Sequence, residues 1–132
     1  MKSPIQRVMV TGSSGYLGST LVSLLEESYE VTGIDIAHSP STHKLVDLTN
    51  KEAVIEACKG QDAIIHTAAL HAPHVHIHSR EAFIDTNIKG TLYLLEAAQE
   101  YGIRRFVYSS STSVYGNSLV SPHQAVWVTE EL

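Results

Sequence analysis

A glycine-rich segment at residues 11–18, TGSSGYLG, constrains the fold of this chain more than any other feature. An apolar run at residues 7–10 precedes it, and leucines recur at helical spacing over residues 16–28. This order predicts a buried strand, a glycine turn and a helix. The expected buried stripe of the helix comprises Leu17, Leu21, Leu24 and Leu25. Such a unit binds phosphates, because free backbone N–H groups and the helix dipole face the anion.

Each of the three glycines has its own expected role. Gly12 is expected to allow the tight turn, Gly15 to leave room for a pyrophosphate, and Gly18 to let the helix pack closely on its strand. Asp35 ends the next apolar run, about twenty residues further on, where a carboxylate reaches the adenosine ribose. A carboxylate there repels a 2′-phosphate and residues 36–38 contain no Arg, so NAD is favoured over NADP. The alternative interpretation of Asp35 is a solvated acid at a strand end.

The rest of the chain alternates predicted strands with predicted helices. Further strands are expected at residues 30–36, 44–46, 62–67 and 105–109, and further helices at residues 49–59 and 81–101. This alternation predicts an α/β fold of the Rossmann type, a doubly wound parallel sheet of about five strands in the order 3-2-1-4-5 within three αβα layers. The 132 residues are expected to form one domain, with a core at residues 1–116 and a turn-rich tail at residues 117–132.

The composition argues against several classes of function. The formal net charge is −5 with nine Lys and Arg, which disfavours nucleic-acid binding because the phosphate backbone is bound mainly by basic patches. We recognise neither a signal sequence nor an apolar run of membrane-spanning length, and expect a cytoplasmic protein without a membrane partner. The single cysteine, Cys58, lies in a helical pattern that favours a buried, inert thiol.

Two motifs resemble one known family. The spacing Gly12-x-x-Gly15-x-x-Gly18 after Thr11 differs from the usual G-x-G-x-x-G fingerprint. It resembles the short-chain dehydrogenase/reductase superfamily, specifically its extended branch of NAD(P)-dependent sugar-nucleotide epimerases and dehydratases. The segment YSSSTSVYG at residues 108–116 resembles the same branch. The resemblance implies an NAD cofactor and a nucleotide-sugar substrate, and it covers only the front part of the family's fold, without the C-terminal substrate lobe.

The resemblance also implies which residues bind the cofactor. They lie in the glycine turn, at strand ends and on the long helix: Thr11, Gly12, Ser14, Gly15, Tyr16, Leu17, Gly18, Asp35, Ile36, Asp47, Leu48, Thr67, Ala68, Ala69, Asn87 and Ser109. In the family, the residue at Asp47 meets the adenine amino group and the helix carrying Asn87 borders the nicotinamide. As a bare sequence feature, Asp47 could equally cap the helix that follows it. His66, in the crevice wall, is interpreted as a hydrogen-bonded core histidine rather than an acid or base.

Ser111 is the implied catalytic residue, because the third serine of this run hydrogen-bonds the substrate oxygen in the family. The alternative is a cluster of hydroxyls, with Thr112 and Ser113, that satisfies backbone groups at the strand end. The family also needs a Tyr followed four residues later by a Lys, which lowers the phenol pKa from about 10. No Tyr of this chain has that partner. We therefore expect no useful turnover from the 132 residues alone, and the rival interpretation is a non-catalytic dinucleotide-binding module.

Two further features carry expectations about ligands and partners. The histidines at positions 71, 74, 76 and 78 have no Cys or acid beside them before Glu81, so a substrate-loop role is favoured over a metal site. The strand at residues 105–109 is expected at an open sheet edge, and residues 83–98 are expected to expose apolar surface. We therefore expect a homo-oligomer, or a tail that covers one of these surfaces with Val126, Trp127 and Val128.

Overall fold

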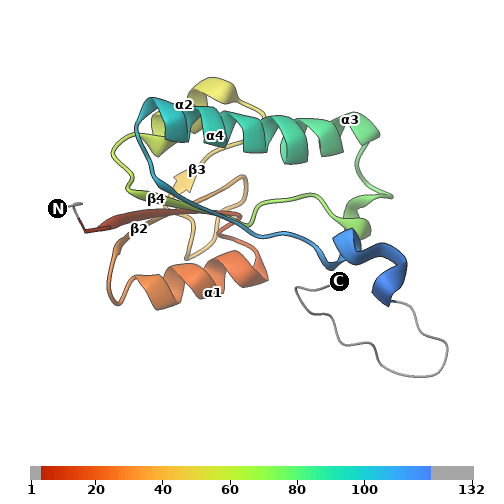
Figure 1. Ribbon diagram of the computed structural model, residues 1–132, viewed down its shortest axis with the longest axis horizontal. Coiled ribbons are helices and arrows are strands. Elements are labelled where there is room, and N and C mark those ends of the chain that lie inside the picture. The colour runs from red at the N-terminus through yellow and green to blue at the C-terminus, as the bar shows by residue number, and fades with distance from the viewer. Residues whose placement is uncertain (1–3, 120–132) are drawn as a thin grey trace.

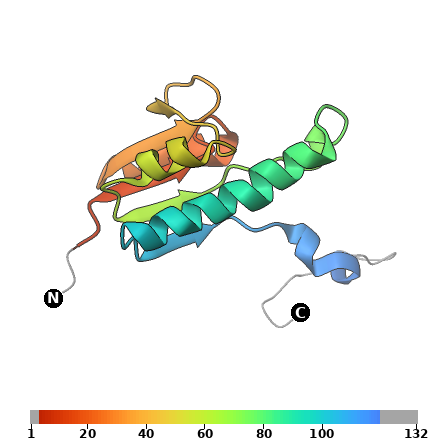
Figure 2. The same ribbon diagram turned by 90° about the horizontal axis from the view of Figure 1, so that it is seen from above.

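The computed structural model describes residues 4–119, which form one parallel sheet with helices on both faces (Figure 1). The strands are β1 (Arg7–Thr11), β2 (Glu30–Asp35), β3 (Lys44–Leu45), β4 (Ala63–His66) and β5 (Arg105–Tyr108). Their order is β3-β2-β1-β4-β5, which confirms the predicted Rossmann-type topology. Helix α1 (Tyr16–Leu25) covers one face, and α2 (Lys51–Cys58) and α4 (Gly90–Glu100) cover the other (Figures 1 and 2).

The core consists of two apolar clusters, one on each face of the sheet. The larger cluster lies beneath α2 and α4 and includes Met9, Ile34, Val54, Ile64 and Leu94. The smaller cluster lies against α1 and includes Val8, Val10, Val22 and Ala63. Successive residues of β1 enter opposite clusters because strand side chains alternate between the two faces. Cys58 belongs to the larger cluster and is fully buried, as expected, and this burial raises the pKa of its thiol to about 12.

The buried face of α1 differs from the predicted leucine stripe. Gly18 and Val22 are buried, whereas Leu17 and Leu24 are 48% and 61% exposed. The prediction is therefore wrong for these two leucines. The close approach of Gly18 to the preceding turn sets the rotation of the helix, because a β-carbon on Gly18 would lie 2.0 Å from the carbonyl oxygen of Gly12.

The predicted helix at residues 81–101 consists of three consecutive helical segments. They are α3 (Arg80–Phe83), the π-helical segment η2 (Ile84–Lys89) and α4. A π-helical segment shifts the side-chain phase of a helix and is often found at functional sites. Four large apolar side chains of these segments are exposed, namely Ile84, Ile88, Leu92 and Leu95, which we call the outer apolar face. This exposure confirms the apolar surface predicted for residues 83–98.

Strand β5 forms one edge of the sheet in the described part of the chain. Val107 and Tyr108 on this strand are more than half exposed. Beyond it, the 3-10 segment η3 (Thr112–Leu119) leads away from the sheet (Figure 2). The predicted covering residues Val126, Trp127 and Val128 lie outside the described residues. Within residues 4–119, none of the helices has the length and apolar character needed to cross a membrane.

Candidate functional site

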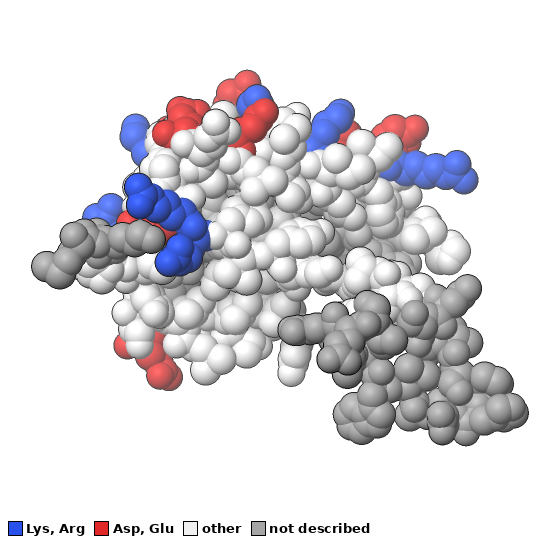
Figure 3. Space-filling view, viewed as in Figure 1, with Lys and Arg blue, Asp and Glu red and all other residues white. Residues whose placement is uncertain are grey.

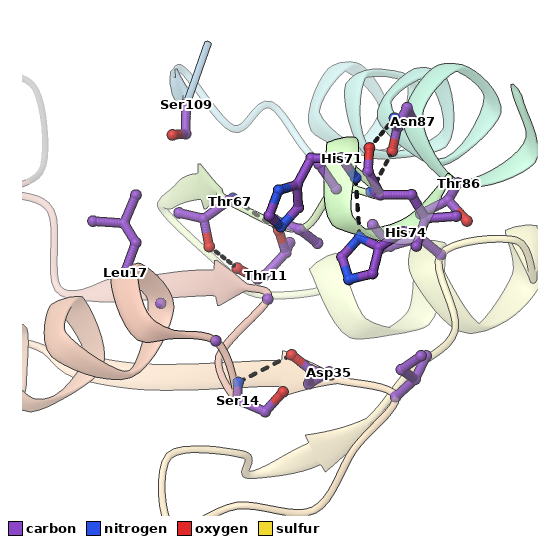
Figure 4. Close-up of a pocket in the computed structure, with 18 of the residues that line it drawn as sticks. Thr11, Ser14, Leu17, Asp35, Thr67, His71, His74, Thr86, Asn87 and Ser109 are labelled. Carbon is purple, nitrogen blue, oxygen red and sulfur yellow. Dashed lines mark hydrogen bonds between the residues drawn. The ribbon is translucent and has the colours of Figure 1, made fainter. Parts of the chain in front are cut away.

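A crevice of about 1110 Å³ runs along the carboxyl ends of the strands (Figure 4). This is where parallel α/β sheets bind their ligands. Every residue that the sequence assigns to the cofactor lines this crevice, and so does Ser111. The structure thus brings together residues from positions 11 to 111 of the chain.

The glycine turn between β1 and α1 forms the central wall of the crevice. Gly12 has a φ of +70°, and a β-carbon there would lie 2.8 Å from the amide nitrogen of Ala68 and 2.9 Å from Thr67 Oγ1. Gly15, in contrast, has an ordinary φ of −75°, and its β-carbon would meet only the Gly12 carbonyl oxygen, at 3.3 Å. The fold therefore requires glycine at position 12, whereas at position 15 the space left open lies on the crevice side.

Asp35 is hydrogen-bonded to the glycine turn before any ligand is considered. The Ser14 N–H donates to Asp35 Oδ2 over 3.0 Å, and the Ala37 N–H donates to Asp35 Oδ1 over 3.0 Å. Figure 4 shows the first of these bonds at the floor of the crevice. Each carboxylate oxygen keeps a further acceptor position for a ribose hydroxyl. The Ser14 N–H is consequently engaged by Asp35 rather than free for a phosphate.

Asp47 does not cap the helix that follows it. Its Oδ1 accepts from the backbone N–H and the hydroxyl of Thr49, over 2.9 and 2.8 Å. The cap of α2 is Asn50, whose Oδ1 accepts from the Ala53 N–H over 3.1 Å. The capping alternative for Asp47 is therefore wrong, because the residue directly before α2 is closer to the free N–H groups. The Asp47 carboxylate instead lines the crevice.

His66 ends β4 behind the crevice wall and is only 1% exposed. Its Nδ1 lies 2.7 Å from Thr11 Oγ1, and its Nε2 lies 2.9 Å from Thr91 Oγ1. Burial lowers the pKa of His66 to about 4, so the imidazole is neutral near pH 7. These contacts confirm the prediction of a hydrogen-bonded core histidine.

The β5 end of the crevice is lined by hydroxyl and imidazole groups. Ser111 Oγ accepts from the Ser113 N–H over 3.2 Å, so the predicted alternative, a hydroxyl that satisfies a backbone group, describes one of its contacts. His71 and His74 also line the crevice and extend toward its interior in Figure 4, with ring centroids 4.6 Å apart. Among residues 4–119, no group of three or more His, Cys, Asp or Glu side chains is arranged to hold a metal ion.

Asn87 uses its side-chain amide within the protein. Its Oδ1 accepts from the Leu70 N–H and its Nδ2 donates to the Leu70 carbonyl oxygen, each over 2.8 Å (Figure 4). Sequence reasoning did not identify Leu70, Ala37 or Tyr108 as part of the crevice, yet all three line it. The signal for Tyr108 was present, because it ends a predicted parallel strand. Ala37 and Leu70 make their hydrogen bonds through backbone groups, which every residue type has, so the sequence carries no signal for them.

The fold and the crevice together define a dinucleotide-binding domain of the Rossmann type. A family model described as the NAD dependent epimerase/dehydratase family matches residues 8–131. The chain belongs to this family, whose cofactor is NAD. This finding confirms the resemblance that the glycine turn and the serine run indicate.

Individual relatives agree with the family assignment. A 3-beta-hydroxysteroid dehydrogenase of Mycolicibacterium neoaurum is 38% identical over 125 residues, which are 86% of this chain and 34% of that protein. UDP-glucose 4-epimerase of Bacillus subtilis (strain 168) is 34% identical over 133 residues, 87% of this chain and 39% of that protein. The crystal structure of a short-chain dehydrogenase/reductase superfamily protein from Agrobacterium tumefaciens with bound NAD has a TM-score of 0.77 and 30% identity, covering 86% of this chain and 35% of that one. The chain thus spans 34–39% of the length of these curated relatives.

Proposed function

We propose that this chain is the NAD-binding portion of an enzyme that transfers a hydride to and from a carbon of a nucleotide sugar. The observation that carries the proposal is the bond between the Ser14 N–H and the Asp35 carboxylate, which joins the glycine turn to the end of β2. A carboxylate held in this way is oriented for the two hydroxyls of an adenosine ribose. The remaining N–H groups at the start of α1 are available to the pyrophosphate.

The residues of this chain would bind and orient the reactants. When bound, NAD supplies the hydride acceptor and donor of the reaction. The dinucleotide can lie against the small side chains of Thr67, Ala68 and Ala69. Ser111 would hydrogen-bond the substrate oxygen. Within the described residues the Ser111 hydroxyl only accepts a hydrogen bond, from the Ser113 N–H, so its proton can be donated to the substrate oxygen.

The nucleotide-sugar class is supported by the serine run and by UDP-glucose 4-epimerases among the relatives. A hydroxysteroid is the second candidate substrate, because the 38% identical relative is named a 3-beta-hydroxysteroid dehydrogenase. Saturation-transfer NMR of the chain with NAD, using UDP-glucose and a 3-beta-hydroxysteroid in separate samples, distinguishes the two. Transfer to the sugar nucleotide alone is expected, and transfer to the steroid alone would reverse the assignment.

Titration calorimetry with NAD and NADP tests the cofactor proposal. We expect tighter binding of NAD, and we expect D35N to weaken NAD binding roughly 10- to 100-fold, since hydrogen bonds to a charged group contribute about 1.5–3 kcal/mol. The matched control is D62N. Asp62 also accepts two backbone N–H bonds, from Gln6 and Arg7 over 2.9 and 2.8 Å, but it precedes β4 at the opposite end of the sheet. Equal or tighter binding of NADP would contradict the role given to Asp35.

A non-catalytic NAD-binding module is the alternative of a different class. No tyrosine in these 132 residues is followed four places later by a lysine, and the general acid-base contribution of such a pair is typically 10²–10⁴-fold. The coding sequence that follows Leu132 separates the two proposals. A Tyr-x-x-x-Lys pair encoded in frame soon after it would identify an enzyme, whereas NAD binding with no such pair would identify the module.

A further inference from the structure

One continuous series of hydrogen bonds runs from the glycine turn to the loop that follows β4, and it passes through the buried ring of His66. Thr11 Oγ1 contacts His66 Nδ1, and His66 Nε2 contacts Thr91 Oγ1. The Thr91 hydroxyl donates to the carbonyl oxygen of Asn87 over 2.7 Å, and the Asn87 amide pairs with both backbone groups of Leu70. The series therefore connects residues from β1, β4, η2 and α4 to Leu70, which directly precedes His71 and begins the loop at residues 70–78.

The direction of every bond at His66 follows from counting protons. A carbonyl oxygen can only accept, so the single hydroxyl proton of Thr91 belongs to its bond with Asn87. Thr91 Oγ1 must then accept from His66, which places a proton on Nε2. His66 Nδ1 is consequently unprotonated and accepts the hydroxyl proton of Thr11.

The acceptor positions of Thr11 Oγ1 show why His66 Nδ1 carries no proton. Thr11 Oγ1 receives the N–H groups of Thr67 and Ala68, over 3.2 and 3.1 Å, so both of its lone pairs are occupied. An added proton on His66 Nδ1 would face this oxygen without an acceptor. The rings nearest to His66 are Phe106 and Tyr108, at centroid distances of 6.1 and 5.5 Å, and no charged side chain hydrogen-bonds to it within the described residues.

We propose that His66, held as the neutral Nε2–H tautomer between Thr11 and Thr91, is a positioning residue that fixes the cofactor turn relative to the loop at residues 70–78. The inference rests on the proposed function, because it assigns that loop to the substrate side of an NAD site. His66 and Thr91 do not line the crevice, so they act through the residues that do. Thr11, Thr67 and Ala68 transmit the effect to the cofactor wall, and Asn87 with Leu70 transmits it to the loop.

The first test is the protonation pattern of the wild-type ring. Long-range ¹H–¹⁵N correlation spectra of the ¹⁵N-labelled chain report which imidazole nitrogen carries the proton. We expect His66 to show a protonated Nε2 and an unprotonated Nδ1 at every pH between 5 and 8, because burial also lowers its pKa to about 4. A protonated Nδ1, or a change of form within that range, would overturn the inference.

The second test removes one hydroxyl and keeps the shape of the side chain. T91V deletes the acceptor for His66 Nε2–H and the donor to Asn87, and T91S keeps both. The matched control is T20V, because the Thr20 hydroxyl also donates to a carbonyl four residues earlier, that of Tyr16 over 2.8 Å, without contacting a histidine. We expect the Kd for NAD to rise about three- to tenfold in T91V, the range given by one or two buried hydrogen bonds, and to change less than twofold in T91S and T20V.

Amide chemical shifts of Leu70 and His71 provide the readout at the far end of the series. They are expected to move in T91V and to stay in place in T20V. Equal NAD affinities and equal Leu70 shifts in T91V and T20V would refute the positioning role. If T91V does not fold, the wild-type tautomer measurement still decides the inference. If the wild-type chain binds no NAD, the proposed function fails, and the tautomer and the Leu70 shift alone decide whether His66 positions the loop.

Discussion

The two ends of the crevice are built differently. At the end formed by β2 and β3, Asp35 is bonded to the glycine turn and Asp47 to Thr49, so both carboxylates are oriented by the protein's own backbone. At the end formed by β5, the serines at positions 109–111 are exposed, and within the described residues the Ser111 side chain makes one hydrogen bond, with the Ser113 N–H. The comparison teaches that the β2 and β3 end, which we propose binds the adenosine and call the adenosine end, is preorganised within the described residues. The β5 end, which we propose faces the substrate, is built from exposed hydroxyl groups.

The glycine turn offers the largest expected effects at the preorganised end. A β-carbon at Gly18 would lie 2.0 Å from the Gly12 carbonyl oxygen, a contact that only a displaced turn can relieve. We expect G18V to lower the free energy of unfolding by about 3 kcal/mol or more, as overpacked sites do. At Gly15 the nearest atom lies 3.3 Å away and the backbone is extended, so we expect G15V to fold and to lose NAD binding. Urea denaturation and calorimetry measure the two effects.

G15V and G18V can also contradict the view that the glycine turn belongs to a preformed binding site. Normal NAD binding by G15V would place the phosphate site away from the glycine turn. A G15V protein as unstable as G18V would show that Gly15 serves the fold and not the ligand. Either result would remove the reason for regarding the adenosine end as a preformed binding site.

The sequence predicted the sheet and the crevice because both depend on patterns that are local. Apolar runs identify β1 and β4, and parallel strands bring their carboxyl-end residues to one edge whatever the details of packing. Properties that depend on tertiary contacts were missed. Leu17 and Leu24 fit a helical stripe, but the contact of Gly18 with the turn rotates them outward. The π-helical segment η2 has no recognised signature within an otherwise regular helical pattern.

The hydrogen-bond partners of His66 are a second property that depends on tertiary contacts and could not be predicted from the sequence. Thr11 and Thr91 lie 55 and 25 residues away in the chain, and neither spacing corresponds to any local rule. A histidine that ends an apolar strand indicates burial and little else. Its tautomer follows only from the proton count of its neighbours, which requires coordinates.

The pH dependence of stability tests the region that joins the two ends. Burial lowers the pKa of His66 from 6.5 to about 4. Between these two pH values, His66 is therefore protonated in the unfolded chain and neutral in the folded chain. This contribution to stability is fully present above pH 6.5 and is lost as the pH falls from 6.5 toward 4. A difference of this size corresponds to about 3 kcal/mol. Urea denaturation of the wild type and of H66N, at pH 7 and at pH 4.5, measures it.

As the pH is lowered from 7 to 4.5, we expect the free energy of unfolding to decrease more in the wild type than in H66N. H66N removes the titrating group while its amide oxygen can still accept from Thr11. Parallel pH profiles for the two proteins would mean that His66 ionises as easily in the folded state as in the unfolded state. The network between the two ends would then be more open to solvent than its contacts indicate.

The smallest expected effect concerns self-association through the outer apolar face, which lies on η2 and α4. Ile84, Ile88, Leu92 and Leu95 are 46–64% exposed. Figure 3 shows that charged side chains gather along the top and at the left of the view, while the middle of this face carries few of them. We propose that two copies of the chain associate through this face, in a symmetric arrangement that uses each residue twice.

Covering the exposed half of a leucine contributes about 1 kcal/mol for each copy. L92A is therefore expected to weaken self-association roughly tenfold or more, with a change of at most about 0.5 kcal/mol in the stability of the single chain.

The matched control is L24A, which truncates a leucine that is 61% exposed on α1, across the sheet. Light scattering at several concentrations would show a shift toward monomer in L92A and none in L24A. A wild-type chain that stays monomeric at every concentration would leave the outer apolar face without a partner copy, and equal shifts in both variants would point to nonspecific association instead.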